Sequence, residues 1–372
     1  MITDFATAMR RALEKTRAND PAAATALIQE ALAGKVPAGK GLAGKGLTGK
    51  GLALPGGLER PTPQAPLEYP LPASLMRDGC KPCAGGGLMQ GLTLPRLPAG
   101  GKIEVPEGAR YESRIHSGPA GSRGYTLYIP TSRPGGFRGV VLMLHGCTQT
   151  PDDFARGTRM NEAAEKDGFV VAYPEQSRAH NMQSCWNWFR PEDQARGQGE
   201  PEILAGIARA LLAEFDLPRD RAFVAGLSAG GAMAAILAEA YPDLFAAAGV
   251  HSGLPTGAAS DVVSAFAAMR GEGRTRPRSQ RTPMIVFHGL ADVTVAPVNG
   301  ARLVSGSGVE TRHEDKGRTW SRLVDSDGSE LWRVAQAGHA WFGGDPAGSY
   351  TDPLGPDASG EMLRFFRQVV EN

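Results

Sequence analysis

The chain has 372 residues, and 40 lysines and arginines nearly balance 39 aspartates and glutamates. Because proteins that bind nucleic acids neutralise phosphates with an excess of basic residues, this balance argues against nucleic-acid binding. Hydrophobic residues make up 41% and charged residues 21%, which is ordinary globular usage and argues against global disorder. No apolar run approaches the ~20 residues that a membrane-spanning helix needs.

The first third of the chain is predicted to lie outside the main domain. Apolar residues at helical spacing predict helix over residues 1–33, where Arg10 and Glu14 interrupt any apolar core of a secretory signal. Residues 34–108 are rich in Gly and Pro and carry three Gly-Lys-Gly-Leu repeats, so we expect an irregular linker. The repeats are not a Walker-type phosphate loop, because no Ser or Thr follows their lysines.

From about residue 109, short apolar runs alternate with amphipathic patterns of helical length. Strands are predicted over residues 111–116, 125–129, 140–144, 169–173, 222–225, 246–250, 284–288 and 331–335, and helices over residues 152–166, 201–215, 229–240 and 359–370. This alternation is typical of an α/β protein with a mostly parallel central sheet and helices on both faces. We therefore expect one α/β domain over residues 109–372.

A Gly-x-Ser-x-Gly motif occupies residues 226–230 and centres on Ser228. The motif is weak alone, but here it follows a predicted strand and opens a predicted helix. That context is typical of a nucleophile elbow, in which the glycines allow a sharp turn and the serine hydroxyl stands above the sheet at a helix N-terminus. Ser228 is therefore the predicted nucleophile; the alternative is an ordinary Gly-rich turn.

A serine nucleophile needs a histidine base, and in this arrangement the acid and then the histidine follow the serine along the chain. Of the seven histidines, His313 and His339 follow the best acid candidate. His313 lies in a charged stretch typical of a solvated segment. His339 lies in a turn directly after the predicted strand 331–335, where sheet enzymes place their sites. His339 is therefore the predicted base.

The orienting acid should also follow a strand. Asp292 ends a short loop after the predicted strand 284–288, whereas Asp261 and Asp315 follow no such strand. Asp292 is the predicted acid. The alternative is that Asp292 caps a helix that begins near Val295.

Acyl transfer also needs N–H donors for the developing oxyanion. The loop after the predicted strand 140–144 suits one donor, the backbone N–H of Cys147, and the start of the helix after the nucleophile supplies the other, the N–H of Ala229. The proposed chemistry needs no metal and no organic cofactor.

Four cysteines are present. Cys80 and Cys83 form a Cys-x-x-Cys pair with neither the further ligands of a zinc site nor a thioredoxin-like context, which favours an incidental or locally bridged pair. We call residues 145–149, which carry the proposed donor Cys147, the oxyanion loop. A disulfide between Cys147 and Cys185 would hold the aromatic loop at residues 185–189 against it. Two buried free thiols are the alternative.

Five motifs in this order resemble the poly(3-hydroxybutyrate) depolymerase family of esterases, which is related to feruloyl and acetylxylan esterases. They are Leu-His-Gly-Cys-Thr-Gln at 144–149, Ser-Cys-Trp-Asn-Trp at 184–188, Gly-Leu-Ser-Ala-Gly-Gly-Ala-Met at 226–233, His-Gly-Leu-Ala-Asp at 288–292 and Gly-His-Ala-Trp at 338–341. The resemblance covers residues 109–370. It implies an α/β-hydrolase fold and a Ser228–Asp292–His339 triad.

The resemblance also implies a disulfide between Cys147 and Cys185, and substrate contacts from Trp186, with His145 and Trp341 as further candidates. The expected substrate is a short-chain polyhydroxyalkanoate polymer or oligomer, and the alternative is a feruloyl or acetyl ester of plant polysaccharide. The resemblance and the disulfide predict an extracellular enzyme, whereas the lack of a visible signal peptide favours the cytoplasm. A further hypothesis is that residues 1–108 dock the enzyme on a granule or a partner.

Overall fold

The computed structural model describes residues 103–131, 135–274, 282–315 and 317–371. The predictions for residues 1–33, for most of the linker and for Cys80 and Cys83 lie outside these ranges. Within the described part of the chain, no helix is both long and apolar enough to cross a membrane.

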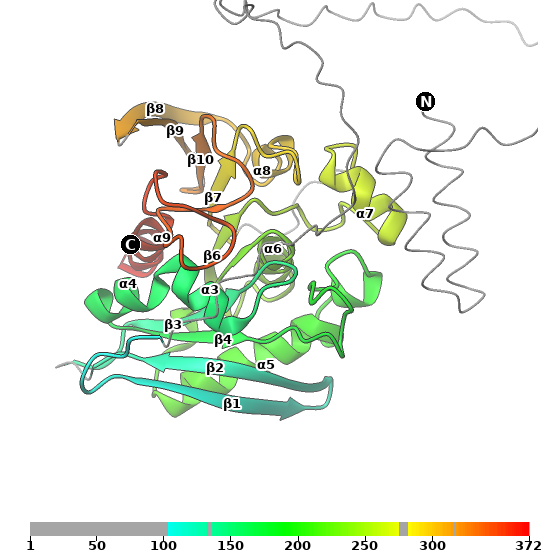
Figure 1. The fold of residues 1–372 in the computed structure, drawn as a ribbon. Coiled ribbons are helices and arrows are strands. Elements are labelled where there is room, and N and C mark those ends of the chain that lie inside the picture. The colour runs from blue at the N-terminus through cyan, green and yellow to red at the C-terminus, as the bar shows by residue number, and fades with distance from the viewer. Residues whose placement is uncertain (1–102, 132–134, 275–281, 316, 372) are drawn as a thin grey trace, which may run out of the picture. The chain divides into compact units, whose positions relative to one another are not determined.

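A ten-stranded sheet forms the centre of the described domain, with the strand order β1-β2-β4-β3-β5-β6-β7-β10-β9-β8 (Figure 1). The six central strands, β4, β3, β5, β6, β7 and β10, are parallel to one another. At the two edges of the sheet, β1 and β2 and then β9 and β8 are added in antiparallel fashion. The strands are β1 (Arg110–Gly118), β2 (Gly121–Ile129), β3 (Gly139–Leu144), β4 (Phe169–Pro174), β5 (Ala222–Leu227), β6 (Phe245–His251), β7 (Met284–Gly289), β8 (Gly308–Asp315), β9 (Arg318–Asp325) and β10 (Glu330–Val334). Two short strands, β11 (Trp341–Phe342) and β12 (Thr351–Asp352), pair separately.

Helices cover both faces of the sheet, as the alternating pattern predicts. They are α3 (Pro151–Thr158), α4 (Met160–Asp167), α5 (Gly199–Glu214), α6 (Ala229–Ala240), α7 (Val262–Met269), α8 (Val298–Ala301) and α9 (Ala358–Glu371), with single 3-10 turns at η2 (Pro191–Asp193) and η3 (Arg219–Arg221). Alternate residues of β3 enter different cores: Leu142 packs in the core that includes α5 and α6, and Val141 in the core that includes α4 and α9. This two-sided burial explains why the central strands are continuous apolar runs.

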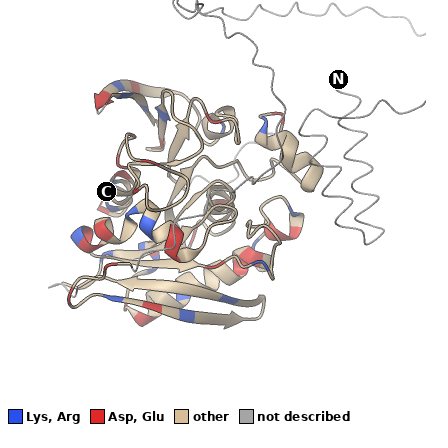
Figure 2. Ribbon diagram, in the orientation of Figure 1, with Lys and Arg blue, Asp and Glu red and all other residues tan. Residues whose placement is uncertain are grey.

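Figure 2 shows that charged residues lie on the covering helices rather than on the middle strands of the sheet. Charges of both signs mix along α4 and α5, whereas β3, β4 and β5 carry none. Charged side chains are costly to bury without a partner, so they gather on the solvated helix faces.

Several elements differ from the sequence prediction, among them α7, α8, β11 and β12, which were not predicted. The single helix predicted over residues 152–166 is two helices, α3 and α4, separated at Arg159, whose φ of 54° is left-handed. The antiparallel hairpin of β8 and β9 was not predicted. All eight residues of β8 are exposed, so this strand lacks the apolar alternation that marks a half-buried strand.

Candidate active site

The predicted site residues all follow parallel strands at the same edge of the sheet. Ser228 follows β5, Asp292 follows β7 and His339 follows β10, and β6 is the one strand between β5 and β7. Because parallel strands end at a common edge, three segments that are far apart in sequence meet there.

Ser228 lies at a sharp turn between β5 and α6, with φ 58° and ψ −117°. Its hydroxyl makes no capping hydrogen bond to the helix that it precedes, although serine often caps helices. Its backbone N–H donates to the carbonyl of His251 at 2.9 Å, which ties the turn to the end of β6. The strained backbone is typical of a nucleophile elbow.

The motif glycines are required by close packing rather than by their own dihedral angles. A Cβ on Gly230 would lie 2.0 Å from the carbonyl oxygen of Leu144, and one on Gly226 would lie 2.4 Å from the carbonyl carbon of Gly230. Neither glycine has a left-handed φ; that conformation belongs to Ser228 itself. The glycines therefore allow the sharp turn by permitting close backbone packing, while the left-handed residue is the serine.

Asp292 and His339 form a hydrogen-bonded pair. Nδ1 of His339 lies 2.7 Å from Oδ2 of Asp292, whose other oxygen accepts the N–H groups of Thr294 and Val295, both at 2.9 Å. The carboxylate therefore orders its own loop, as the capping alternative suggested, and also contacts the histidine. It does not cap α8, which begins only at Val298.

The electrostatics keep Asp292 ionised. Burial raises the pKa of this carboxyl, but hydrogen bonds from His288 and His339 outweigh burial and hold it well below its usual range. An ionised Asp292 can only accept, so the Nδ1 proton of His339 points to Asp292 and Nε2 is left as the basic atom. About 11% of the His339 side chain remains exposed.

The oxyanion loop lies directly beside the elbow. A Cβ on Gly146 would lie 3.7 Å from Cβ of Ser228. The carbonyl of Gly146 accepts the Nδ1 proton of His145 at 2.7 Å, because the His145 Nε2 already accepts the N–H of Gln176 at 3.1 Å. In a trans peptide the N–H points opposite to the carbonyl, so His145 orients the N–H of Cys147.

The second predicted donor is the N–H of Ala229. Ala229 is the first residue of α6, so its N–H has no acceptor within the helix. The positive end of the helix dipole also favours negative charge at this point.

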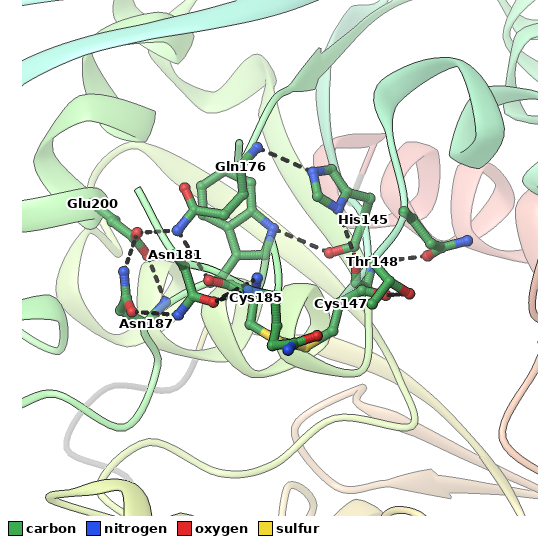
Figure 3. Close-up of a disulfide and its surroundings, with 12 residues drawn as sticks. His145, Cys147, Thr148, Gln176, Asn181, Cys185, Asn187 and Glu200 are labelled. Carbon is green, nitrogen blue, oxygen red and sulfur yellow. Dashed lines mark hydrogen bonds between the residues drawn. A yellow bond between two sulfur atoms is a disulfide. The ribbon is translucent and has the colours of Figure 1, made fainter. Parts of the chain in front are cut away.

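A disulfide joins Cys147 to Cys185, as the family resemblance implied (Figure 3). It connects the oxyanion loop after β3 to the loop that follows β4. A backbone hydrogen bond from Thr148 to the carbonyl of Gln183, at 2.8 Å, joins the same two loops.

A buried polar network that the sequence did not reveal supports the Cys185 loop (Figure 3). Glu200, near the start of α5, accepts the backbone and side-chain N–H groups of Asn187, both at 2.7 Å, and the amide of Gln176. Gln176 also donates to the carbonyl of Cys185 at 3.0 Å. Burial raises the pKa of Glu200, against the lowering effect of these donors. Isolated polar residues far apart in sequence carry no signal that they will meet.

The three side chains predicted to bind substrate are buried. His145 and Trp186 are 0% exposed and Trp341 is 1% exposed. The Trp186 indole N–H donates to the carbonyl of His145 at 3.1 Å, and the Trp341 indole N–H donates to Ser359, also at 3.1 Å. In this conformation these side chains support the loops around the site rather than face a ligand, because the polar group of each is hydrogen-bonded inside the protein.

Gln149 links the oxyanion loop to the segment between β11 and β12, which follows the loop of His339. Its Oε1 accepts the N–H of Gly146 at 2.9 Å, and its Nε2 donates to the backbone oxygen and hydroxyl of Ser349 and to Asp153, all at 3.1 Å. Gln149 is 4% exposed. Gln149 belongs to the 144–149 motif, but the sequence analysis predicted no role for it. Among the described residues, no group of three or more His, Cys, Asp or Glu side chains is placed to hold a metal ion.

The fold is that of the α/β hydrolases. An acetyl xylan esterase from Aspergillus awamori superimposes with a TM-score of 0.54 over 69% of this chain and 99% of its own, at 20% identity, which establishes the fold. Residues 123–309 match the family described as esterase PHB depolymerase, and the chain belongs to that family.

Curated relatives agree with the family. Poly(3-hydroxyalkanoate) depolymerase C of Paucimonas lemoignei is 33% identical over 46% of this chain and 44% of its own length. A probable acetylxylan esterase A of Aspergillus fumigatus is 29% identical over 49% and 53%, and a feruloyl esterase B of Neurospora crassa is 27% identical over 67% and 89%. The chain thus spans about half the length of the first two relatives and most of the third.

Proposed function

We propose that the protein is a serine esterase that cleaves carboxylic esters through an acyl-enzyme. The observation that carries this proposal is the 2.7 Å pair of Asp292 and His339 at the sheet edge where Ser228 stands on a strained elbow. His339 takes the proton of Ser228 as the hydroxyl attacks the ester carbonyl. Asp292 orients His339 and stabilises its charge, and the N–H groups of Cys147 and Ala229 hold the oxyanion.

The second half of the reaction uses the same groups. His339 gives its proton to the departing alcohol, which leaves the acyl group on Ser228. His339 then takes a proton from water, which attacks the acyl-enzyme, and the acid departs with Ser228 restored.

Family membership supports an ester of a short-chain 3-hydroxyalkanoate, in polymer or oligomer form, as the substrate. The relatives described as acetylxylan and feruloyl esterases support the alternative of plant polysaccharide esters. Release of hydroxybutyrate from its oligomers, compared with release of ferulate from arabinoxylan, distinguishes the two.

The test of the activity is Ser228→Ala. We expect hydrolysis of a short p-nitrophenyl ester to fall by at least about 10³-fold with an unchanged thermal midpoint, because only the nucleophile is removed. Ser113→Ala, at an exposed serine on the edge strand β1, is the matched control and should retain full activity. Wild-type turnover in Ser228→Ala would refute the assignment.

We further propose that the chain divides into a helical segment, a linker and a catalytic domain at residues 109–372, and that residues 1–108 dock on a granule or a partner. The helical pattern and the Gly-Lys-Gly-Leu repeats support this docking role. Deletion of residues 1–66 should reduce co-sedimentation with polyester granules while ester hydrolysis in solution continues. Unchanged co-sedimentation would exclude granule docking by this segment.

A further inference from the structure

Tyr350 is an exposed aromatic residue beside the proposed base. Its side chain is 48% exposed, and its ring centroid lies 6.5 Å from that of His339 in an edge-on arrangement of 82°. Since Trp186 and Trp341 are buried, they do not offer a ring to a ligand in this conformation. Tyr350 does.

The backbone holds Tyr350 in a costly conformation. Its φ is 53°, a left-handed value that is uncommon for a bulky residue. Its carbonyl accepts the N–H of Trp341 at 2.7 Å. Such a conformation persists only where neighbouring contacts over-determine it, and it is often found at functional sites.

The preceding residue supplies those contacts. The Ser349 N–H donates to Asp153 at 3.0 Å, its hydroxyl donates to the same carboxylate, and its oxygens accept the amide of Gln149. Gly348 packs so closely on α3 that a Cβ there would lie 2.3 Å from Cα of Gly157. The loop is therefore anchored to α3, and Tyr350 is a fixed part of the site surface.

We propose that Tyr350 contacts the alcohol portion of the ester and favours an extended apolar alcohol portion, such as a polyester chain or a phenyl ring, over a small one. This inference rests on the proposed function. His339 must hand its proton to the departing alkoxide, so the alcohol portion lies against the imidazole and not across the site from it. A ring held beside that imidazole meets the alcohol side of the substrate.

Two further exposed apolar residues lie on the loop that carries Asp292. Leu290, 53% exposed, and Val293, 97% exposed, lie within two residues of Asp292, which contacts His339. Their exposed apolar side chains add apolar surface at the edge of the sheet where the proposed site lies, and such a surface favours an apolar alcohol portion over a polar one.

The experiment compares esters that differ on one side only, with phenyl acetate against methyl acetate for the alcohol and phenyl acetate against phenyl butyrate for the acyl group. In Tyr350→Ala, we expect kcat/KM for phenyl acetate to fall about threefold to tenfold more than for methyl acetate, which is the usual worth of an aromatic contact. The ratio between phenyl butyrate and phenyl acetate should not change. The deacylation rate should also be unchanged, because the alcohol has already left.

Two control variants frame the result. Tyr350→Phe keeps the ring and should keep the wild-type ratios. Ile115→Ala removes an apolar side chain that is 76% exposed on the edge strand β1, and it should change nothing. An equal fall for both acetates, or a change confined to the acyl series, would overturn the inference. If the wild type hydrolyses none of these esters, the proposed function fails; if it hydrolyses them and Tyr350→Ala keeps their ratios, only the role of Tyr350 fails.

Discussion

Burial separates the histidines that hold the structure together from the one that can act as a base. His145, His251 and His288 are fully buried, and each uses a ring nitrogen in a hydrogen bond with the backbone. His339 keeps part of its surface exposed and contacts the buried carboxylate of Asp292. The residue type alone does not distinguish these roles, because the ring chemistry is the same in all four.

The buried imidazole of His145 makes stability depend on pH. Burial lowers its pKa to about 4, below the value of 6.5 for an exposed histidine. Between pH 6.5 and pH 4 the unfolded chain therefore binds more protons than the folded one. The contribution of His145 to the free energy of unfolding therefore falls as pH falls through this window, by an amount on the order of 3 kcal/mol.

His145→Asn tests this linkage, since the asparagine amide can still donate to Gly146 but does not titrate. We expect the variant to be less stable than the wild type at pH 7 and to lose less stability between pH 7 and pH 4, as measured by urea unfolding. His313→Asn, at an exposed site on β8, should keep the wild-type pH dependence. Parallel curves for His145→Asn and the wild type would contradict the prediction.

At the scale of elements, the elbow requires β5, α6 and β3 to approach so closely that no side chain fits at Gly226 or Gly230. The first turn of α6 packs against the carbonyl of Leu144 at the end of β3, and only glycine fits there. This contact also places the start of α6 beside the oxyanion loop, since Gly146 lies against both Ser228 and Gln149.

Gly230→Ala should therefore be strongly destabilising. The added Cβ would lie 2.0 Å from a backbone oxygen that cannot move without shifting β3. We expect a loss of about 3 kcal/mol in the free energy of unfolding, the upper end of overpacking costs. Gly338→Ala is the matched control, because its Cβ would meet no atom within 4 Å. Similar urea midpoints for the two variants would show that the close packing is not a constraint.

At the scale of the whole domain, the sheet gathers at one edge the loops that follow β3, β4, β5, β7 and β10. The first two of these loops are joined covalently by Cys147 and Cys185, which are separated by 38 positions. Glu200 and Asn187 hold the second loop from inside. The proposed oxyanion donor, the N–H of Cys147, is thus supported by segments from several parts of the chain.

Loss of the disulfide should affect both stability and rate. For a loop of this length, the Cys147→Ser/Cys185→Ser double variant should be less stable by about 4 kcal/mol, because the unfolded chain regains loop freedom. Turnover should also fall, since the oxyanion loop loses its covalent support. Dithiothreitol should lower the activity of the wild type but leave that of the double variant unchanged. Equal sensitivity of both proteins to the reductant would show that another cysteine pair is responsible.

The sequence by itself determined the α/β fold, the segments that form the parallel strands, and the edge of the sheet at which the proposed site lies. Strand and helix periods are local, and continuous apolar runs such as 140–144 and 169–173 mark strands that are buried on both faces. The candidate residues Ser228, Asp292 and His339 could be selected because each follows such a strand.

Only the tertiary structure decided which polar and aromatic residues serve the site. Strand β8 is exposed throughout and has no apolar period, and the helix predicted over residues 152–166 is interrupted at Arg159, which adopts a left-handed φ. Trp186 and Trp341 are buried while Tyr350 is exposed, although all three are aromatic residues near motif positions. Exposure and hydrogen-bond partners come from segments distant in sequence, so local patterns do not contain them.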